Sequence, residues 1–259
     1  MSRLQLKQLT SELEPSFWSV VGKDYYDYYF FIYDWLLQRD RTKIFLALKA
    51  DAIAGIIVVY NGSIAQLRGS KQAVGFLLEN LPSKSMDVQA PQNCEQLLTA
   101  KYPDAQLKAH VTLMVLNKGM EQFNIKVNPQ HLGSEDAGEI AELMHASFSK
   151  MWGEISAQDI RSRMEAKEAV WLGIKEDGNL VSFGYATLTS KVCHVTWVAT
   201  SPQHKNRGYA TSVVSALVKE CLGVAESAMI YVMDDNQIAK GLYSKVGFKP
   251  YKAYFFIKN

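Results

Sequence analysis

The stretch from Cys193 to Leu222 constrains the fold most, because its periodicity changes within a few residues. Residues 193–198, Cys-His-Val-Thr-Trp-Val, are mostly β-branched or aromatic, which is typical of a buried strand. Pro202 has no amide hydrogen to contribute to a sheet, so we expect the strand to end before it. Helical spacing then begins, and one face holds Ala210, Val213, Val214, Leu217, Val218, Cys221 and Leu222. The stretch therefore predicts a strand, a short loop and a helix.

The predicted loop is basic and contains a glycine. His204, Lys205 and Arg207 precede Gly208. Amide hydrogens at a helix N-terminus have no partner within the helix, and the helix dipole adds partial positive charge there. A glycine at this point lets an anion approach the backbone closely. We therefore predict a phosphate or pyrophosphate site at this loop.

The predicted elements occur in the same order in both halves of the chain. Asn61-Gly62 is a strong hairpin signal in the first half, and Asp177-Gly178 is the corresponding hairpin signal in the second. Three strands, a helix, a strand, a helix and a strand are predicted over residues 44–49, 52–60, 63–68, 70–80, 86–90, 94–100 and 110–117. The same order is predicted over residues 169–175, 180–189, 193–199, 210–222, 228–233, 236–246 and 251–258.

Further elements precede each set. We predict a helix over residues 11–38 before the first set. Before the second we predict a strand over 123–127 and helices over 136–148 and 157–166. The repeated order favours an α+β fold (α/β/α) of two tandem units. Each unit is expected to be a mixed, mostly antiparallel twisted sheet flanked by helices. The expected division is into residues 1–120 and residues 121–259.

The composition argues against several classes of protein. The 259 residues carry a net charge of +2 without long runs of like charge, so nothing indicates a nucleic-acid partner. The three cysteines, Cys94, Cys193 and Cys221, lack the spacing of a disulfide framework or zinc site, and we predict no metal. The N-terminus does not resemble a signal peptide, and no apolar stretch reaches the roughly 18 residues of a membrane helix. We expect a cytoplasmic protein without a membrane partner.

Two ordered motifs in the second half resemble those of the GCN5-related N-acetyltransferase (GNAT) superfamily. Its acetyl-CoA motif, Q/R-x-x-G-x-G/A, is matched by Lys205-Asn-Arg-Gly-Tyr-Ala210. A later family motif, Asn-x-x-Ala-x-x-Leu-Tyr-x-x-x-Gly-Phe, is matched by residues 236–248. The first position is Lys205 in place of Gln or Arg, which keeps a charge but not the planar fork of arginine. The resemblance implies a GNAT fold that uses acetyl-CoA as co-substrate.

The paired halves also resemble the glycine N-acyltransferase-like branch, in which a degenerate first half precedes a catalytic second half. In the first half, residues Leu67–Val74 stand where the phosphate loop would be, but they hold one glycine and lack the G-x-G/A spacing. We therefore expect the first half not to bind acetyl-CoA and to be non-catalytic. Its expected role is structural, with a contribution to covering the acceptor site.

The resemblance assigns roles to named residues. Backbone amides from about Lys205 to Thr211 are expected to hold the pyrophosphate. An amide near Val198 or Ala199, where the strand leaves its neighbour, is expected to stabilise the oxyanion. Tyr243 is expected to protonate the leaving thiolate, although its position also suits a core tyrosine. The predicted acetyl-CoA residues are Val198, Ala199, Thr200, Lys205, Asn206, Arg207, Gly208, Tyr209, Ala210, Thr211, Asn236 and Ala239.

The group that takes the proton of the attacking amine is less defined. The family often has a glutamate on the strand before the loop, but residues 193–198 contain no carboxylate. His194 is the acid–base group available there, and histidine titrates near neutral pH. A chain of water molecules is the alternative, and a purely structural histidine is a third reading. Asn236 is expected either to contact coenzyme A or to cap its helix.

The reaction implied is transfer of an acetyl group to a primary amine of a small molecule or amino acid, by direct attack in a ternary complex. A protein or peptide N-terminal acetyltransferase and a non-catalytic acyl-CoA-binding regulator are the alternatives. The acceptor pocket is expected around Ser147–Arg163 and Lys249–Tyr254. Candidate acceptor contacts are Trp152, Glu154, Arg161 and Arg163. The acceptor and the oligomeric state stay open.

Overall fold

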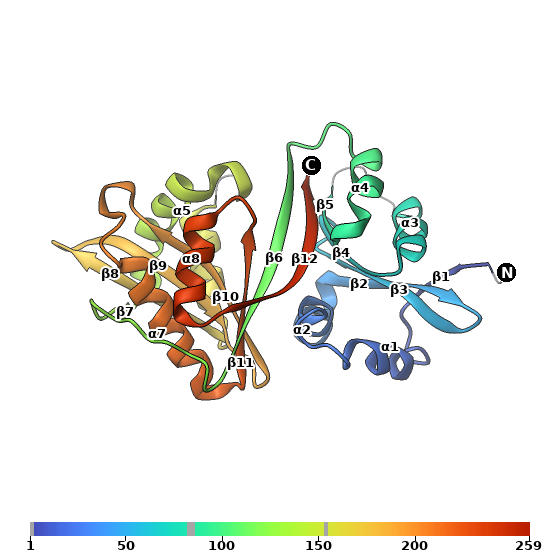
Figure 1. Ribbon diagram of the computed structural model, residues 1–259, viewed down its shortest axis with the longest axis horizontal. Helices are drawn as coiled ribbons and strands as arrows, with labels where there is room; N and C mark the ends of the chain where they lie inside the picture. Colours follow the sequence, from blue (N-terminus) through green and yellow to red (C-terminus); the bar gives the residue numbers. More distant parts are fainter. Residues whose placement is uncertain (1–2, 82–85, 153–154) are drawn as a thin grey trace. The chain divides into compact units, whose positions relative to one another are not determined.

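The computed structural model describes residues 3–81, 86–152 and 155–259, with the side chains of residues 149–152 left aside. The chain forms two compact units (Figure 1). The first comprises Met1–Thr112 together with Lys252–Asn259, and the second comprises Leu113–Tyr251. The predicted division at residue 120 assigned the last strand to the second half, whereas most of that strand belongs to the first unit.

The sheet of the first unit has the strand order β1-β2-β3-β4-β5-β12. Its strands are β1 (Gln5–Gln8), β2 (Thr42–Lys49), β3 (Ala52–Tyr60), β4 (Ile64–Gly69), β5 (Asp87–Pro91) and β12 (Lys249–Lys258). The pairing is antiparallel except between β4 and β5, which are parallel. The C-terminal strand β12 pairs with β5, with Phe255 opposite Ala90. The end of the chain thus completes the sheet formed by its beginning.

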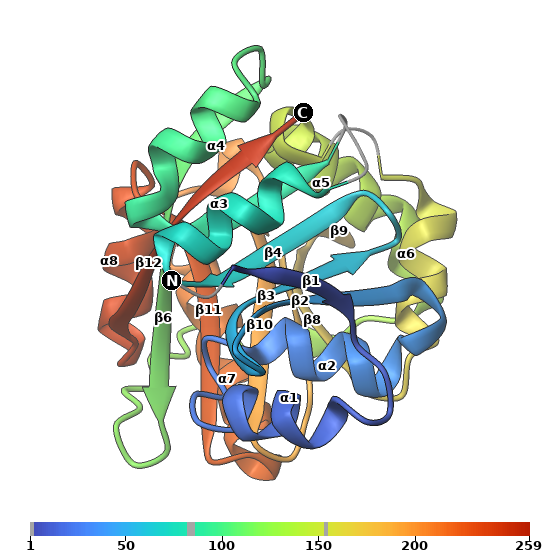
Figure 2. The same ribbon diagram turned by 90° about the vertical axis from the view of Figure 1, so that its right-hand side faces the viewer.

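Helices cover both faces of this sheet (Figure 2). On one face lie α1 (Glu14–Val21) and α2 (Tyr29–Leu37), followed by the short η1 (Arg39–Arg41). On the other lie α3 (Lys71–Glu79), η2 (Gln92–Cys94) and α4 (Glu95–Lys101). Alternation along the strands supplies both cores: Ile56 and Val58 pack with α1 and α2, and Ile57 and Val59 pack with α3 and α4.

The sheet of the second unit has the strand order β6-β11-β10-β9-β8-β7. Its strands are β6 (Leu107–Asn117, which begins in the first unit), β7 (Gln130–His131), β8 (Ala169–Glu176), β9 (Asn179–Thr187), β10 (Val192–Thr200) and β11 (Ser227–Met233). β10 and β11 are parallel, whereas β9 pairs antiparallel with both β10 and β8. The unit therefore repeats the strand arrangement of the first.

Helices again flank this sheet. One core lies under α7 (Tyr209–Val224) and α8 (Gln237–Val246), and η4 (Pro202–His204) precedes α7. The other core lies under α5 (Ala137–Trp152) and α6 (Ala157–Met164), and η3 (Ser134–Asp136) precedes α5. The predicted fold class, mixed twisted sheets flanked by helices in a tandem arrangement, is confirmed.

The predicted hairpin turns are present and show why these dipeptides occur there. Asn61 and Gly62 have φ values of 51° and 69°, and Asp177 and Gly178 have 50° and 82°. The β8–β9 connection has two residues, between Glu176 and Asn179, and the β3–β4 connection has three, between Tyr60 and Ile64. Two successive residues with positive φ match the right-handed twist of the strands they join. These turns fix the β3–β4 and β8–β9 registers.

Two local predictions were wrong, and one strand was missed. Residues 11–38 form two helices, because α1 ends at Gly22 and a turn at Asp24 precedes α2. Residues 123–127 form no strand. The amides of Asn124 and Lys126 instead donate to the hydroxyls of Ser215 and Ser212 on α7. The edge strand β1 was not predicted, because its four residues are all exposed and lack apolar alternation.

Candidate active site

A bulge in β10 opens the sheet of the second unit. The parallel pairing of β10 with β11 ends at His194 opposite Met229. Two residues later the register with β9 shifts, between Thr196 and Ala199. Trp197 within this shift has φ of 50°, an unusual conformation for a bulky residue. The bulge therefore marks the point where β10 is no longer paired with β11.

The bulge also decides which side chains face which helices. Val195 and Val198 contact the core under α7 and α8. Trp197 and Ala199 contact the core under α5 and α6. Strict alternation places His194 on the α5 side, because its neighbours Cys193 and Val195 lie on the α7 side. At the opening, His194 and Trp197 thus lie on the α5 face of the sheet, and Val198 lies on the α7 face.

The loop after β10 carries two residues with positive φ. Asn206 has φ of 64°, and Gly208, at the N-cap of α7, has φ of 86°. No side chain caps α7 at its N-cap residue. A Cβ added at Gly208 would have as its nearest neighbour the Lys126 side chain, at 3.5 Å. Backbone in this conformation at an uncapped helix start is a concave arrangement of amides suited to an anion.

Lys126 was not predicted as part of this site. It belongs to the segment that was expected to be a strand. Its amide instead donates to Ser212 Oγ over 3.0 Å, which holds it beside the first turn of α7. The contact joins residues 86 positions apart, and its sequence signal is the pair Ser212 and Ser215 among the apolar residues of the buried helix face. The structure adds this lysine to the predicted cations Lys205 and Arg207.

Glu176, at the end of β8, is a second residue that sequence reasoning missed. Its carboxylate lies 3.2 Å from Nη1 of Arg207 and 3.2 Å from Nε2 of His204. It also accepts a hydrogen bond from the hydroxyl of Tyr209, the first residue of α7. Glu176 therefore orders three side chains of the loop and neutralises part of its positive charge.

Helix α8 has the ends that its motif predicted. Oδ1 of Asn236 accepts a hydrogen bond from the amide of Ala239 over 3.1 Å, so Asn236 is the N-cap. Gly247 ends the helix with φ of 117°. A Cβ at that position would lie 2.4 Å from the carbonyl oxygen of Met120, which explains the requirement for glycine. The predicted capping role of Asn236 is confirmed, and its contact with coenzyme A stays a prediction.

Tyr243 lies in the core shared by α7, α8 and the sheet. The residue is 7% exposed, and its ring meets Phe248 edge to face at 6.1 Å between centroids. Tyr209 belongs to the same core, and Val198 and Ala239 pack against it. Burial raises the pKa of Tyr243 well above its usual value, so its hydroxyl is protonated at neutral pH.

His194 differs from the expectation of a group that titrates near neutral pH. Burial lowers its pKa to about 4, because the charged imidazolium is poorly solvated there. Its ring meets that of Tyr231 on β11 edge to face, with centroids 5.9 Å apart. At neutral pH His194 is therefore an uncharged imidazole of low basicity.

The predicted acceptor residues separate into different places. Arg163 lies with its guanidinium 4.7 Å from the ring centroid of Trp197, the residue of the bulge. Arg161 lines a separate pocket beside β7 and β8. Glu154 lies outside the described residues, as does the side chain of Trp152. An aromatic cluster adjoins Trp197, with Tyr185 and Trp171 stacked at 4.4 Å.

Among residues 3–81, 86–152 and 155–259, no three His, Cys, Asp or Glu side chains are grouped so as to hold a metal ion. Within the same ranges, no helix is both long and apolar enough to cross a membrane. The three cysteines are buried free thiols.

Comparison with known proteins gives a family match within the second unit. Residues 137–248 match the model of the acetyltransferase (GNAT) family. No curated protein matches the chain.

Solved structures match nearly the whole chain. A Drosophila protein has a TM-score of 0.73 at 14% identity, over 99% of this chain and 98% of its own. A GNAT-family acetyltransferase of Colwellia psychrerythraea has a TM-score of 0.61 at 14% identity, over 98% of this chain and 100% of its own. A tandem GNAT protein from the clavulanic acid biosynthesis pathway gives 0.62 at 12% identity, over 98% of each chain. At these identities the structural matches establish the fold.

The resemblance to the glycine N-acyltransferase-like branch stays a prediction, since none of these matches names that branch. The family motifs, the family match over residues 137–248 and the tandem fold agree with one another. Residues 137–248 therefore resemble the acetyltransferase (GNAT) family, within a fold shared with tandem GNAT proteins.

Proposed function

We propose that the protein transfers an acetyl group from acetyl-CoA to a primary amine of a small molecule or amino acid, by direct attack in a ternary complex. The observation that carries the proposal is the bulge of β10 beside the uncapped start of α7. A thioester needs an oxyanion donor next to a pyrophosphate site, and these two features lie at the two ends of one short segment. The proposal also agrees with the family of this domain.

The residues around Gly208 suit the phosphates of acetyl-CoA. Backbone amides from Lys205 to Thr211 would bind the pyrophosphate, and the absence of a side chain at Gly208 leaves room for it. Lys205, Arg207 and Lys126 would add positive charge. Arg207 would do so while shared with Glu176, from which it is 3.2 Å away. Asn236 and Ala239, at the start of α8, are the proposed contacts on the second helix.

The bulge would supply the donor for the developing oxyanion. A backbone amide at Val198 or Ala199 would donate to the acyl oxygen as the amine attacks the carbonyl carbon and the C–S bond breaks. One donor of this kind contributes roughly 3–4 kcal/mol of transition-state stabilisation. The contribution depends on the donor being fixed in advance, which the bulge would achieve.

Tyr243 would assist the departing sulfur. Burial keeps its hydroxyl protonated, so it is a donor throughout the neutral range. Its raised pKa also makes full proton transfer to a thiolate unfavourable, because a free thiol has a pKa of about 8.5. Its main contribution would therefore be a hydrogen bond to the sulfur as negative charge accumulates.

His194 would accept the proton of the amine, directly or through water. Its neutral imidazole is available at pH 7, and the low pKa limits its strength as a base. Strict alternation places it on the face opposite Tyr243, so the amine would approach from the α5 side and the thiol would leave on the α7 side. Arg163 near the bulge would attract an acceptor that carries a carboxylate, which favours an amino acid.

The pH dependence of kcat/KM tests the role of His194. If His194 is the base, the profile of kcat/KM should have an inflection near pH 4, because the pKa of His194 is about 4. Ionisation of His194 should cause no change in kcat/KM between pH 6 and pH 8. His194→Gln should lower kcat about ten-fold and remove that inflection. An unchanged rate and profile in the variant would assign the role to water.

The overall activity is tested by thiol release with a panel of primary amines, amino acids and short peptides, set beside calorimetry with acetyl-CoA. Release with small amines or amino acids supports the proposal. Release with peptides alone would indicate an N-terminal acetyltransferase. Binding without release on any acceptor would indicate a regulator. The buried free thiols favour a reducing compartment, and we propose the cytoplasm.

A further inference from the structure

The first unit has its own opening between parallel strands. The pairing of β4 with β5 ends at Gln66 opposite Gln89. Beyond it, residues 68–69 of β4, residues 91–93 and residues 252–254 of β12 line a pocket of about 590 Å³. The pocket occupies the place in this sheet that the β10–β11 opening has in the other.

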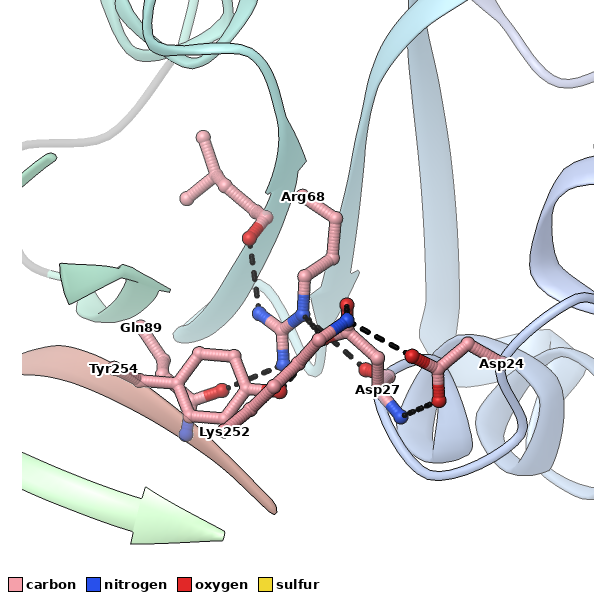
Figure 3. A network of polar contacts seen from close by, with 7 residues as sticks. Asp24, Asp27, Arg68, Gln89, Lys252 and Tyr254 are labelled. Atoms are coloured by element: carbon pink, nitrogen blue, oxygen red, sulfur yellow. Dashed lines mark hydrogen bonds and ion pairs between the residues drawn. The ribbon is translucent and has the colours of Figure 1, made fainter. Parts of the chain in front are cut away.

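A buried arginine stands at the base of this pocket (Figure 3). Arg68 is 2% exposed, and its Nε donates to the Asp27 carboxylate. Its Nη2 donates to Gln89 Oε1 over 2.9 Å, and its guanidinium carbon lies 4.2 Å from the ring centroid of Tyr254. The Tyr254 hydroxyl donates to Asp27 over 2.7 Å. These contacts hold the guanidinium in one position.

Lys252 connects this buried network to the surface. Its ammonium lies 2.5 Å from Asp27 Oδ2 and 2.8 Å from Asp24 Oδ2. Its side chain is 42% exposed, against 2% for Arg68, 10% for Asp27 and 19% for Asp24. The most accessible charge of the network is therefore a cation.

Stability alone does not explain such a network. Removing two charges from water costs several kcal/mol per ion, and well-packed apolar residues of similar volume often replace a buried pair without loss of stability. Charged side chains buried beside a cavity are more typical of functional sites. Burial tends to raise the pKa of Asp27, but Arg68, Lys252 and Tyr254 outweigh it and hold that pKa below its usual value.

We propose that this pocket binds a small carboxylate with a compact apolar body. The Lys252 ammonium contacts the carboxylate, while Asp27 and Arg68 keep the surrounding groups in place. The apolar body lies against the rings of Tyr28, Pro91 and Tyr254, which line the same pocket. An anion can join Lys252 directly, whereas an amine would first have to displace Lys252 from its two carboxylates.

Two features exclude coenzyme A from this pocket. The Arg68 side chain fills the space after the last β4–β5 pair, where a pantetheine arm would pass. The start of α3 offers no vacant concave loop, because Ser70 Oγ already accepts the amide of Ala73. The site is therefore a second one, distinct in chemistry from the proposed acetyl-CoA site.

Calorimetry on the intact chain tests the proposal with three matched probes: cyclohexanecarboxylate, cyclohexanecarboxamide and cyclohexylmethylamine. We expect the carboxylate to bind at least ten-fold more tightly than the amide, and the amine to bind no better than the amide. Lys252→Met should weaken carboxylate binding at least ten-fold. Lys252→Arg should retain part of it, and Lys43→Met, an exposed lysine on β2 of the same unit, should not change it.

Several results would overturn the proposal. They are equal binding of acid and amide, a preference for the amine, unchanged binding in Lys252→Met, and no binding of the acid at about 10 mM. Thermal unfolding of each variant verifies that it is folded. Acetyl-CoA binding is measured separately on the same variants and should be unaffected, so this test is independent of the proposed acetyl transfer.

Discussion

Helices α3 and α7 follow equivalent strands, yet their N-termini are built differently. Ser70 alone separates β4 from α3, and its side chain caps the helix. Residues 201–208 separate β10 from α7, which has no side-chain cap. The first turn is also tied to β3, since the amide of Ser70 donates to Ala54 O over 3.4 Å. A helix N-terminus therefore forms an anion site only where its amides are not already bonded to a capping side chain.

The largest expected effect comes from a comparison of two tyrosines, Tyr243 on α8 of the second unit and Tyr102 at the end of α4 of the first. Tyr243→Phe should lower kcat about 10- to 100-fold, because a hydrogen bond to a charged group contributes roughly 1.5–3 kcal/mol, and should leave acetyl-CoA affinity unchanged. Tyr102→Phe, at the end of α4, is the matched control and should leave kcat unchanged. Steady-state kinetics with thiol detection measures both. Equal effects of the two substitutions would contradict a catalytic role specific to the second unit.

Asp34 in the first unit and His194 in the second each have a pKa that burial alone shifts, and the two shifts have opposite signs. Burial raises the pKa of Asp34 to about 7 and lowers that of His194 to about 4. Asp34 stays protonated in the folded state while the unfolded chain ionises, so stability is lost as pH rises from about 4 to 7. For His194, stability is lost as pH falls from about 6.5 towards 4.

Asp34→Asn should therefore stabilise the first unit at pH 8, by at most about 4 kcal/mol, and should have little effect at pH 4. Urea unfolding at the two pH values measures the difference. His194→Gln is the comparison, because its stabilising effect should occur at pH 4 and vanish at pH 8. Parallel pH responses in the two variants would show that the groups do not differ as described.

Two glycines at the strand–helix junctions should respond to alanine in different ways. Gly69 has φ of 135°, and a Cβ there would lie 2.6 Å from Ala54 O, so Gly69→Ala should cost about 3 kcal/mol of stability. A Cβ at Gly208 would meet only the Lys126 side chain at an ordinary contact distance of 3.5 Å, so Gly208→Ala should cost only the roughly 1 kcal/mol of its positive φ. Gly208→Ala should weaken acetyl-CoA binding about ten-fold, and the folded fraction of Gly69→Ala should bind normally. Chemical unfolding and calorimetry distinguish these outcomes.

The smallest expected effect concerns two cations near the starts of helices, Arg207 before α7 and Lys71 at the first position of α3. Arg207→Gln should weaken acetyl-CoA binding only about three-fold at low salt, because the side chain is 53% exposed and shared with Glu176. The loss should shrink further at 0.5 M salt. Lys71→Gln, at the first position of α3, should have no effect. A loss greater than 30-fold would show that Arg207 leaves Glu176 and contacts the phosphates alone.

Local chemistry made much of the second unit predictable. Positive φ is required at Gly178, Gly208 and Gly247, and glycine at those places predicted a turn, a loop and a helix end. Asn236 was predictable as an N-cap because its side-chain oxygen can accept an amide of the first helical turn. Such positions depend on a few neighbouring residues, so a short motif contains the necessary information.

Features that depend on distant partners could not be predicted. The bulge at Trp197 lies within a β-branched run that would suit a regular strand equally well. Arg68 is buried because of Asp27, which is 41 positions away, and Glu176 meets Arg207 from 31 positions away. The low pKa of His194 likewise reflects its surroundings and not its strand. The bulge, the two ion pairs and the shifted pKa all depend on contacts between residues far apart in the chain, and such contacts cannot be inferred from one sequence.

The pairing of β12 with β5 has a consequence for synthesis. The sheet of the first unit requires Lys252–Lys258, which are synthesised after the whole of the second unit. Domains generally fold N-terminal first as they emerge, but this unit keeps the edge of β5 unpaired until the second unit has been made. An unpaired strand edge is prone to join other chains. The first unit is therefore exposed to mispairing for as long as the second unit takes to be synthesised.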